Sequence, residues 1–295
     1  MFNIRKQAQA HRPEQLEYVE YFGLTDLPFQ ATANPAYAYA HPSLVRGLTQ
    51  MRNVVLGRTG LGMISGNVGL GKTTLAKTTE NDMTARGIHA IMFPAVPGNS
   101  RQTEASIIQD ITARLGIKKV AGNSTQRLYH ELADYAERAE SEGSTVVVII
   151  DDAQNLKDSA VKTILRLLSL QTVDVQLIQI LLYGQNPEMI NALKADRALH
   201  TRLSAHVELQ PFSEDHVGDM LNHRLMIAGR HDPLFTPPAV HAIAEMSGGI
   251  PRIICRVAHD ACILAAERKA KIVELEVVQE AGESLQHSIH AEPHA

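Results

Sequence analysis

The middle of the chain alternates between short apolar runs and longer segments in which apolar residues recur at helical spacing. The short runs are predicted to be strands, and they lie at 62–65, 90–93, 145–150, 175–182 and 205–209. The five consecutive β-branched residues at 146–150 suit a strand that is buried on both faces. Segments with helical periodicity separate them, at 72–86, 101–115, 125–141, 159–170 and 187–196. Strands that alternate with helices in this way pair in parallel. We therefore expect an α/β domain with a five-stranded parallel sheet and helices on both faces.

The pattern changes on both sides of this domain. Beyond Pro211 no strand pattern returns, and helices are expected from Ser213 and at 237–246, 251–267 and 275–285. Ahead of the domain, the aromatic-rich stretch 18–29 precedes a helix predicted at 41–56. This stretch is either a hydrophobic anchor on the core or part of a lid beside a bound ligand. The expected parts are an N-terminal extension (1–56), the α/β domain (57–211), an all-helical lid domain (212–285) and a flexible tail (286–295).

A glycine-rich stretch follows the first predicted strand and ends in Lys72-Thr73, matching G-x-x-x-x-G-K-S/T. Glycines let backbone N–H groups turn toward phosphate oxygens, and the next helix presents its unpaired N–H groups to the same anion. Lys72 is expected to reach the β- and γ-phosphates of ATP, and the Thr73 hydroxyl to ligate Mg²⁺. A turn without a ligand is the alternative, which the strand and helix on either side disfavour. The predicted nucleotide-binding residues are Gly66, Asn67, Val68, Gly69, Leu70, Gly71, Lys72, Thr73 and Thr74.

Two carboxylates, Asp151 and Asp152, follow the most β-branched of the predicted strands. Hydrolysis of a nucleotide requires acidic groups near the phosphates in addition to the loop that binds them. We predict that Asp151 completes the Mg²⁺ shell and that Asp152 orients or deprotonates the attacking water. The alternative is that two carboxylates simply begin a turn.

A polar amide ends the next predicted strand, and a glycine-rich turn opens a helix in the lid domain. Gln185 is the candidate that would lie between the acidic pair and the γ-phosphate, with Asn186 as the second choice and a turn-forming amide before Pro187 as the alternative. In the lid domain Arg252 begins a helix and is predicted to point back toward the phosphates.

Arg197 and Arg202 flank a predicted loop before the last strand. In ring-forming ATPases this region meets the nucleotide of a neighbouring subunit, where an arginine supplied in trans stabilises transition-state charge. Arg202 is the first candidate for this role and Arg197 the second, while solvated surface arginines remain the alternative for each.

Composition narrows the class of protein without selecting a partner. The chain has 295 residues, 44% hydrophobic content and a formal net charge of −4, so no global basic field draws in nucleic acid. Cys255 and Cys262 lie two helical turns apart, which predicts buried thiols in a reducing compartment. Since no apolar run reaches membrane-spanning length, we expect a cytoplasmic protein without direct membrane insertion.

Together these motifs resemble those of the AAA+ ATPases, and within that class the chain is similar to the ExeA/GspA type, whose relatives include TniB-like transposition ATPases. The resemblance covers residues 18–280 and includes three further stretches, which are Tyr21-Phe22-Gly23-Leu24 with Pro28-Phe29, Asp152-Ala153-Gln154-Asn155-Leu156 and Leu234-Phe235-Thr236-Pro237. It implies an ATP-driven homo-oligomer, a ring or a filament, with Walker A and Walker B roles for Lys72, Thr73, Asp151 and Asp152. Gln185 and Arg252 match the strand-end and lid positions.

The resemblance leaves the physiological role open among three functions. The first is an ATP-hydrolysing assembly motor or switch, the second a transposition regulator that coats duplex DNA and recruits a transposase, and the third a secretion or pilus-assembly factor with protein partners. A basic set that could contact DNA phosphates comprises Lys77, Arg86, Arg101, Arg114, Lys118 and Lys119, although a solvated helix face explains it equally well. The family usually has Glu where this chain has Asp152, which predicts slow hydrolysis.

Overall fold

The computed structural model describes residues 13–95, 103–117 and 124–290. The chain divides into two compact units, one made of residues 42–210 and the other of residues up to His41 together with those from Pro211 onward. The segment expected as a single N-terminal extension is therefore divided at His41. Its aromatic stretch belongs to the helical unit, and its long helix belongs to the α/β unit.

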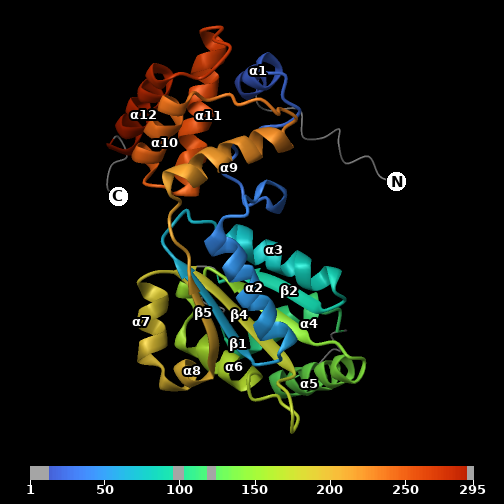
Figure 1. The fold of residues 1–295 in the computed structure, drawn as a ribbon. Helices are drawn as coiled ribbons and strands as arrows, with labels where there is room; N and C mark the ends of the chain where they lie inside the picture. The colour runs from blue at the N-terminus through green and yellow to red at the C-terminus, as the bar shows by residue number, and fades with distance from the viewer. Residues whose placement is uncertain (1–12, 96–102, 118–123, 291–295) are drawn as a thin grey trace. The chain divides into compact units, whose positions relative to one another are not determined.

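Five parallel strands form the sheet of the α/β unit, as predicted. They pair in the order β2-β3-β4-β1-β5. Their bounds are β1 (Leu61–Gly66), β2 (His89–Pro94), β3 (Val146–Asp151), β4 (Ile178–Gln185) and β5 (Leu203–Glu208). Because β4 lies between β3 and β1, the ends of these three strands are neighbours at one edge of the sheet (Figure 1).

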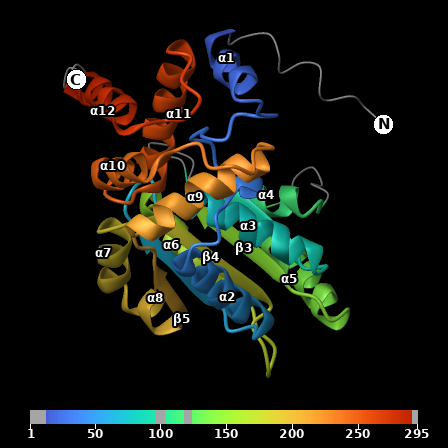
Figure 2. The same cartoon turned by 45° about the horizontal axis from the view of Figure 1, so that its top comes forward.

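Helices cover both faces of this sheet, as the alternation of strands and helices predicts. The helices α2 (Pro42–Leu56) and α3 (Lys72–Ala85) pack on one face (Figures 1 and 2). A large apolar core joins the other face to α4 (Glu104–Arg114), α5 (Thr125–Ser141), α6 (Asp158–Leu167), α7 (Glu188–Ala195) and α8 (Arg197–Arg202). Successive strand residues point to opposite faces, so Ile180 and Leu182 enter this core while Tyr183 points to the face of α3.

Two local predictions are wrong near the ends of the sheet. The fourth strand begins at Ile178 rather than at Val175, because the Thr172 hydroxyl accepts hydrogen bonds from the backbone N–H groups of Asp174 and Val175 and forms a turn. The segment between Arg197 and Arg202 is the helix α8 and not a loop. Asp196 starts it by accepting hydrogen bonds from the next backbone N–H groups, at 2.9 and 3.0 Å.

The second unit is helical and is built from both ends of the chain. It contains α1 (Pro13–Tyr21), the short 3₁₀ helix η2 (Pro35–Tyr37), α9 (Glu214–Ile227), α10 (Pro237–Ser247), α11 (Pro251–Glu267) and α12 (Leu275–His290). α12 continues five residues beyond the predicted end at Leu285, into the segment expected as a flexible tail. Cys255 and Cys262 are buried free thiols on α11, as their spacing predicted. None of the described helices combines the length and hydropathy needed to cross a membrane.

Aromatic residues of the N-terminal stretch attach it to the rest of this unit. Tyr18 is buried, and its hydroxyl lies 3.1 Å from Nδ1 of His259 on α11. Phe29 is also buried and makes an edge-to-face contact with Phe235, with 5.7 Å between the ring centroids. The stretch is thus a hydrophobic anchor within the helical unit.

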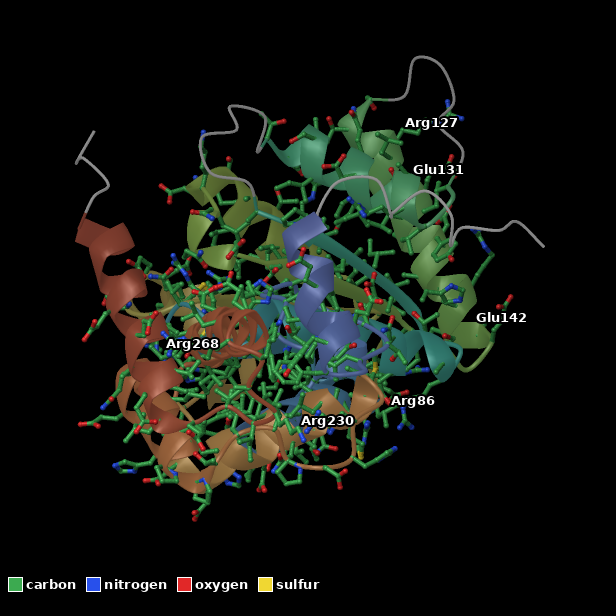
Figure 3. The ribbon with its side chains drawn as sticks, turned by 90° about the horizontal axis from the view of Figure 1, so that it is seen from above. Arg86, Arg127, Glu131, Glu142, Arg230 and Arg268 are labelled. Atoms are coloured by element: carbon green, nitrogen blue, oxygen red, sulfur yellow. The ribbon has the colours of Figure 1, made fainter. Side chains whose placement is uncertain are left out.

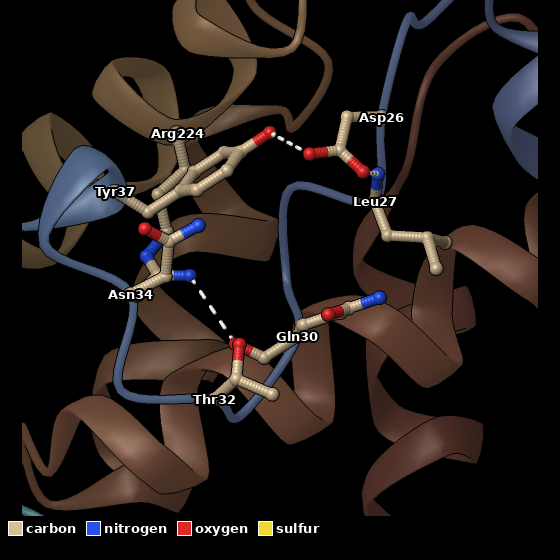
Figure 4. A pocket seen from close by; sticks show the side chains of 7 residues that line it. All are labelled: Asp26, Leu27, Gln30, Thr32, Asn34, Tyr37 and Arg224. Carbon is tan, nitrogen blue, oxygen red and sulfur yellow. Dashed lines mark hydrogen bonds between the residues drawn. The ribbon is translucent and has the colours of Figure 1, made fainter. Parts of the chain in front are cut away.

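A buried arginine on α9 completes this attachment. The Arg224 guanidinium donates from Nη1 to the carbonyl oxygens of Pro28 and Gln30, at 2.9 and 3.4 Å, and lies 5.6 Å from the centre of the Tyr37 ring. The Tyr37 hydroxyl in turn donates to Asp26 Oδ2 at 2.9 Å, as the close view of this small pocket shows (Figure 4). Burial, and then the hydrogen bond to Asp26, raise the pKa of Tyr37 to about 12, so the hydroxyl keeps its proton near neutral pH.

One buried hydrogen bond links the central strand of the sheet to α3. Tyr183 on β4 and Thr79 on α3 are both fully buried, and the tyrosine hydroxyl donates to Thr79 Oγ1 at 2.8 Å. The Thr79 hydroxyl donates onward to the Leu75 carbonyl at 2.8 Å. This chain of two bonds connects β4 to the middle of α3 and, through the Leu75 carbonyl, to the first turn of the helix.

We expect Tyr183→Phe to lower the free energy of unfolding by about 1 kcal/mol, because the fully buried Thr79 oxygen loses its donor. Guanidinium-induced unfolding would show a lower midpoint with an unchanged slope. The matched control is Tyr129→Phe, whose exposed hydroxyl donates to the Arg166 carbonyl and whose loss should change stability by less than about 0.5 kcal/mol. Equal effects of the two substitutions would contradict this role for Tyr183.

Candidate phosphate-binding site

The loop between β1 and α3 has the backbone geometry of an anion cradle. Gly69 and Gly71 have φ values of 84° and 93°, in the left-handed region that favours glycine. A Cβ on Gly66 would lie only 3.2 Å from the Leu209 carbonyl oxygen, so a side chain there would press on the backbone. The loop delivers the chain to Lys72, the first residue of α3, where helix N–H groups have no intrahelical acceptor. The loop and the helix start together suit a phosphate.

Lys72 is buried at the base of the loop. Its Nζ donates hydrogen bonds to the carbonyl oxygens of Gly66 and Asn67, at 2.9 and 2.8 Å. These contacts hold the ammonium group inside the turn, beside the start of α3. A positive charge at this position complements the anion that the helix start favours.

Asp151 lies at the end of β3 and points to the same place. Its side chain is buried, with Thr73 and Lys72 beside it. Burial raises the pKa of the Asp151 carboxyl and the charge of Asp152 adds to this, while Thr73 and the Lys72 ammonium act in the opposite direction. A cation held between Thr73 and Asp151 would stabilise the ionised carboxylate.

The order of the strands places Gln185 between the loop and the acidic pair. Gln185 ends β4, the strand that separates β3 from β1, and it is the register partner of Gly66. The backbone N–H of Asn186 donates to the Gly66 carbonyl at 3.3 Å, while its side-chain amide donates to Glu208 on β5 at 2.7 Å. The Asn186 side chain is thus engaged away from the acidic pair, so Gln185 remains the better candidate.

Asp152 is exposed and has a left-handed backbone conformation, with φ 52° and ψ 38°. Aspartate is one of the few residues other than glycine that adopt this conformation readily. Its Oδ1 accepts a hydrogen bond from Nε2 of Gln154 at 3.3 Å. Gln154 lies in the short 3₁₀ helix η3 (Ala153–Asn155), and the sequence analysis assigned it no role. Gly184 on β4 is the sequence feature that could have indicated this contact, because an isolated glycine within a strand often marks a place where another group approaches the strand backbone closely.

The donor set fits a nucleotide with Mg²⁺. Thr73 and Asp151 offer hydroxyl and carboxylate oxygens, which are the ligands that Mg²⁺ prefers. Lys72 and the start of α3 supply positive charge and N–H donors for phosphate oxygens. The carboxyl edge of the sheet therefore brings together the phosphate loop with Lys72, the acidic pair and Gln185.

Arg202 lies at the opposite edge. It precedes β5, whose first residue Leu203 pairs with Leu61 at the beginning of β1. The length of β1, about 16 Å, therefore separates it from Gly66 of its own chain. The guanidinium is exposed and donates from Nη1 to the Leu165 carbonyl and to Ser169 Oγ, at 2.8 and 3.1 Å. Arg197, at the start of α8, is exposed as well.

Arg252 lies in the helical unit, in the first turn of α11. The turn before it is fixed by Gly249, whose carbonyl accepts a hydrogen bond from the Phe212 backbone N–H at 2.8 Å. A Cβ at Gly249 would come within 2.0 Å of the Phe212 carbonyl oxygen, so only glycine fits. The role of Arg252 toward a nucleotide stays a prediction.

The basic set proposed to contact DNA is only partly described. Arg101, Lys118 and Lys119 lie outside the described residues. Arg86, labelled at the end of α3 in Figure 3, donates to Asp82, whose carboxylate also accepts from Arg52 on α2. Arg127 and Glu131, also labelled, pair along α5 but are not part of that set. Within the set, the charge of Arg86 is balanced by a neighbouring carboxylate.

Comparisons with known proteins agree with this architecture. Residues 55–193 match the family model of the AAA domain. The chain is 31% identical over 254 residues to general secretion pathway protein A of Aeromonas hydrophila, a match that covers 85% of this chain and 45% of that protein. The chain thus spans less than half the length of this curated relative.

Solved structures share the fold at low sequence identity. Cdc6p of Pyrobaculum aerophilum has a TM-score of 0.65 and 18% sequence identity. ORC2 of Aeropyrum pernix has a TM-score of 0.63 and 18% sequence identity. Each of these two matches covers 88% of this chain and 74% of the solved chain. RuvB of Thermotoga maritima, a Holliday junction branch migration motor, has 0.55 and 17%, with 83% and 70% covered. The parallel sheet, the phosphate loop and the family match together show that residues 55–193 form an AAA domain.

Proposed function

We propose that the chain binds ATP with Mg²⁺ at Gly66–Thr73, hydrolyses it slowly, and uses the nucleotide to control assembly of its own oligomers. The observation that carries this proposal is the position of Lys72, whose Nζ donates to the carbonyl oxygens of Gly66 and Asn67 beside the start of α3. Asp151 ends β3, two strands along the sheet from β1, so Thr73 and Asp151 offer oxygen ligands from distant parts of the sequence near this lysine. Mg²⁺ bound there would neutralise charge on the phosphates as the terminal phosphoryl group leaves.

Each residue has a role that follows from its position. Lys72 and the first N–H groups of α3 bind phosphate oxygens, while Thr73 and Asp151 hold the cation. Asp152 accepts a proton from the attacking water or orients it, and Gln185 lies where a side-chain amide would contact the terminal phosphate. Asp152 is one methylene shorter than glutamate, so its reach is smaller, which is the basis for proposing slow turnover.

The proposed oligomer follows from the position of Arg202. An arginine at the edge of the sheet opposite to its own phosphate loop contributes to hydrolysis only through a neighbouring chain. The same edge carries a polar hollow of about 350 Å³ lined by Arg202, Thr59, Gln171 and Ser204, among others. Arg197 remains the second candidate, and Arg252 is proposed to report nucleotide state to the helical unit.

For the physiological role we propose assembly of a protein apparatus of the secretion or pilus type. The similarity to general secretion pathway protein A over most of this chain favours that role over a transposition regulator on duplex DNA. The local pairing of Arg86 with Asp82 agrees with it.

We expect Asp152→Asn to bind ATP normally and to lower turnover by about a hundredfold or more, because an amide cannot accept the proton of the attacking water. Lys72→Ala should instead weaken ATP binding by roughly ten- to a hundredfold, since a charge-assisted contact is lost. Calorimetric titration and a phosphate-release assay separate the two effects. Unchanged turnover in Asp152→Asn would remove this residue from the chemistry.

ATP with Mg²⁺ should increase the molar mass observed by light scattering, because a neighbour completes each site. Arg202→Ala and Asp152→Asn should each be nearly inactive alone, yet their mixture should recover turnover, since one chain then supplies the arginine and the other the intact acid. The same mixture with Arg197→Ala in place of Arg202→Ala identifies which arginine acts. A monomer unaffected by nucleotide, or no recovery with either arginine variant, would contradict action in trans.

Duplex DNA should bind weakly if protein partners are the targets. With a non-hydrolysable ATP analogue, fluorescence anisotropy of labelled duplex is expected to show little binding at physiological salt. Tight binding whose logarithmic affinity falls linearly with the logarithm of salt concentration would instead favour the transposition role.

A further inference from the structure

The side chain of Gln154 forms a bridge from Asp152 to the end of β4. Its Nε2 donates to Asp152 Oδ1 at 3.3 Å, and its Oε1 accepts from the backbone N–H of Gln185 at 2.9 Å. Since the Gln185 N–H is a donor, it must face Oε1, which leaves Nε2 to face the Asp152 carboxylate. One neutral amide thus satisfies a donor at the end of β4 and an acceptor just after β3.

The bridge exists because β4 extends beyond the end of β3. The register between β3 and β4 ends at Ile150 and Leu182, and β4 continues to Gln185 without a β3 partner. A backbone N–H left unpaired there would be unfavourable. Oε1 of Gln154 takes the place of the missing strand carbonyl.

Gly184 provides the space for this contact. A Cβ at this position would lie 3.1 Å from Gln154 Oε1 and 2.3 Å from Met189 Cγ. Any other residue at 184 would therefore displace both side chains. The absence of a side chain at this point of β4 allows the amide to reach the strand backbone.

The neighbouring residue braces η3 on its other side. Asn155 Nδ2 donates to the Ala95 carbonyl at 3.1 Å, just beyond the end of β2. The Ala95 backbone N–H donates to the Asp151 carbonyl at 2.8 Å. η3 is thus held toward β2 by Asn155 and toward β4 by Gln154, with Asp152 immediately before it.

We propose that Gln154 is a positioning residue that fixes the Asp152 carboxylate relative to the end of β4, and so relative to Gln185. The inference rests on the proposed function, in which Asp152 acts on the attacking water. An exposed aspartate has several rotamers, and a donor on one carboxylate oxygen selects among them while the other oxygen stays available for water. The aspartate side chain is also shorter than that of glutamate, so it has less freedom to compensate for a displaced carboxylate.

The test compares Gln154→Met, which keeps the size of the side chain and removes both hydrogen bonds, with Gln50→Met at an exposed site on α2 as the matched control. Gln154→Met should lower kcat about tenfold with the ATP dissociation constant changed less than about twofold. Hydrogen exchange of the Gln185 amide should accelerate roughly five- to tenfold, because its acceptor is gone. Gln50→Met should change neither quantity.

Two further variants separate positioning from general stability. Gln154→Glu keeps an acceptor for Gln185 but puts a carboxylate against Asp152, so exchange at Gln185 should stay slow while kcat falls. In the Asp152→Asn background, Gln154→Met should lower kcat no further, because the group that it positions has already lost its function. Additive effects, or an unchanged Gln185 exchange rate in Gln154→Met, would overturn the proposal.

The two proposals fail in different ways. A chain that binds ATP without any turnover contradicts the proposed hydrolysis and leaves Gln154 no reaction to support, although accelerated Gln185 exchange would still establish the bridge. Normal turnover in wild type with undiminished kcat in Gln154→Met contradicts the positioning role alone.

Discussion

The pairing of β1, β4 and β3 in the sheet is the constraint on which the rest of the candidate site depends. It brings the loop after β1 and Asp151, which ends β3, to the same end of the sheet, on either side of the end of β4. The buried apolar residues of these three strands fix their positions from both faces. Packing of the core therefore determines the position of the polar groups.

The same arrangement explains why buried polar groups are tolerated near the carboxyl edge. The Tyr183 hydroxyl has Thr79 as its acceptor, and Lys72 has two backbone carbonyls. Each of these bonds connects the β4 or loop region to α3, so the helix that begins the phosphate site is attached at its side as well as its start. An anion bound at the helix start would act on a helix that is already held in place.

Much of this architecture could be predicted from the sequence, and the parts that could not have physical reasons. Runs such as 146–150 are apolar on both faces of a strand, and this pattern is enough to predict a buried parallel sheet. The spacing of Gly66, Lys72 and Thr73 likewise predicts a phosphate loop from local geometry.

The start of β4 was misplaced because Val175 is apolar but lies in a turn that the Thr172 hydroxyl forms. The division of the N-terminal extension at His41 depends on which helices Tyr18 and Phe29 contact, which no local pattern reveals. Gln154 was missed for a similar reason, because its partners are 2 and 31 residues away and only the fold brings them together.

The separation of Arg202 from the phosphate loop of its own chain has a consequence for any assembly that uses it. A contact that joins one edge of a subunit to the opposite edge of the next is heterologous, and repeating it produces a polar array. In an open filament, the last subunit at one end has a nucleotide site without a neighbour's arginine, while the last subunit at the other end has an arginine without a site. Only a closed ring completes every site, so hydrolysis per subunit would rise with filament length and reach its maximum on ring closure.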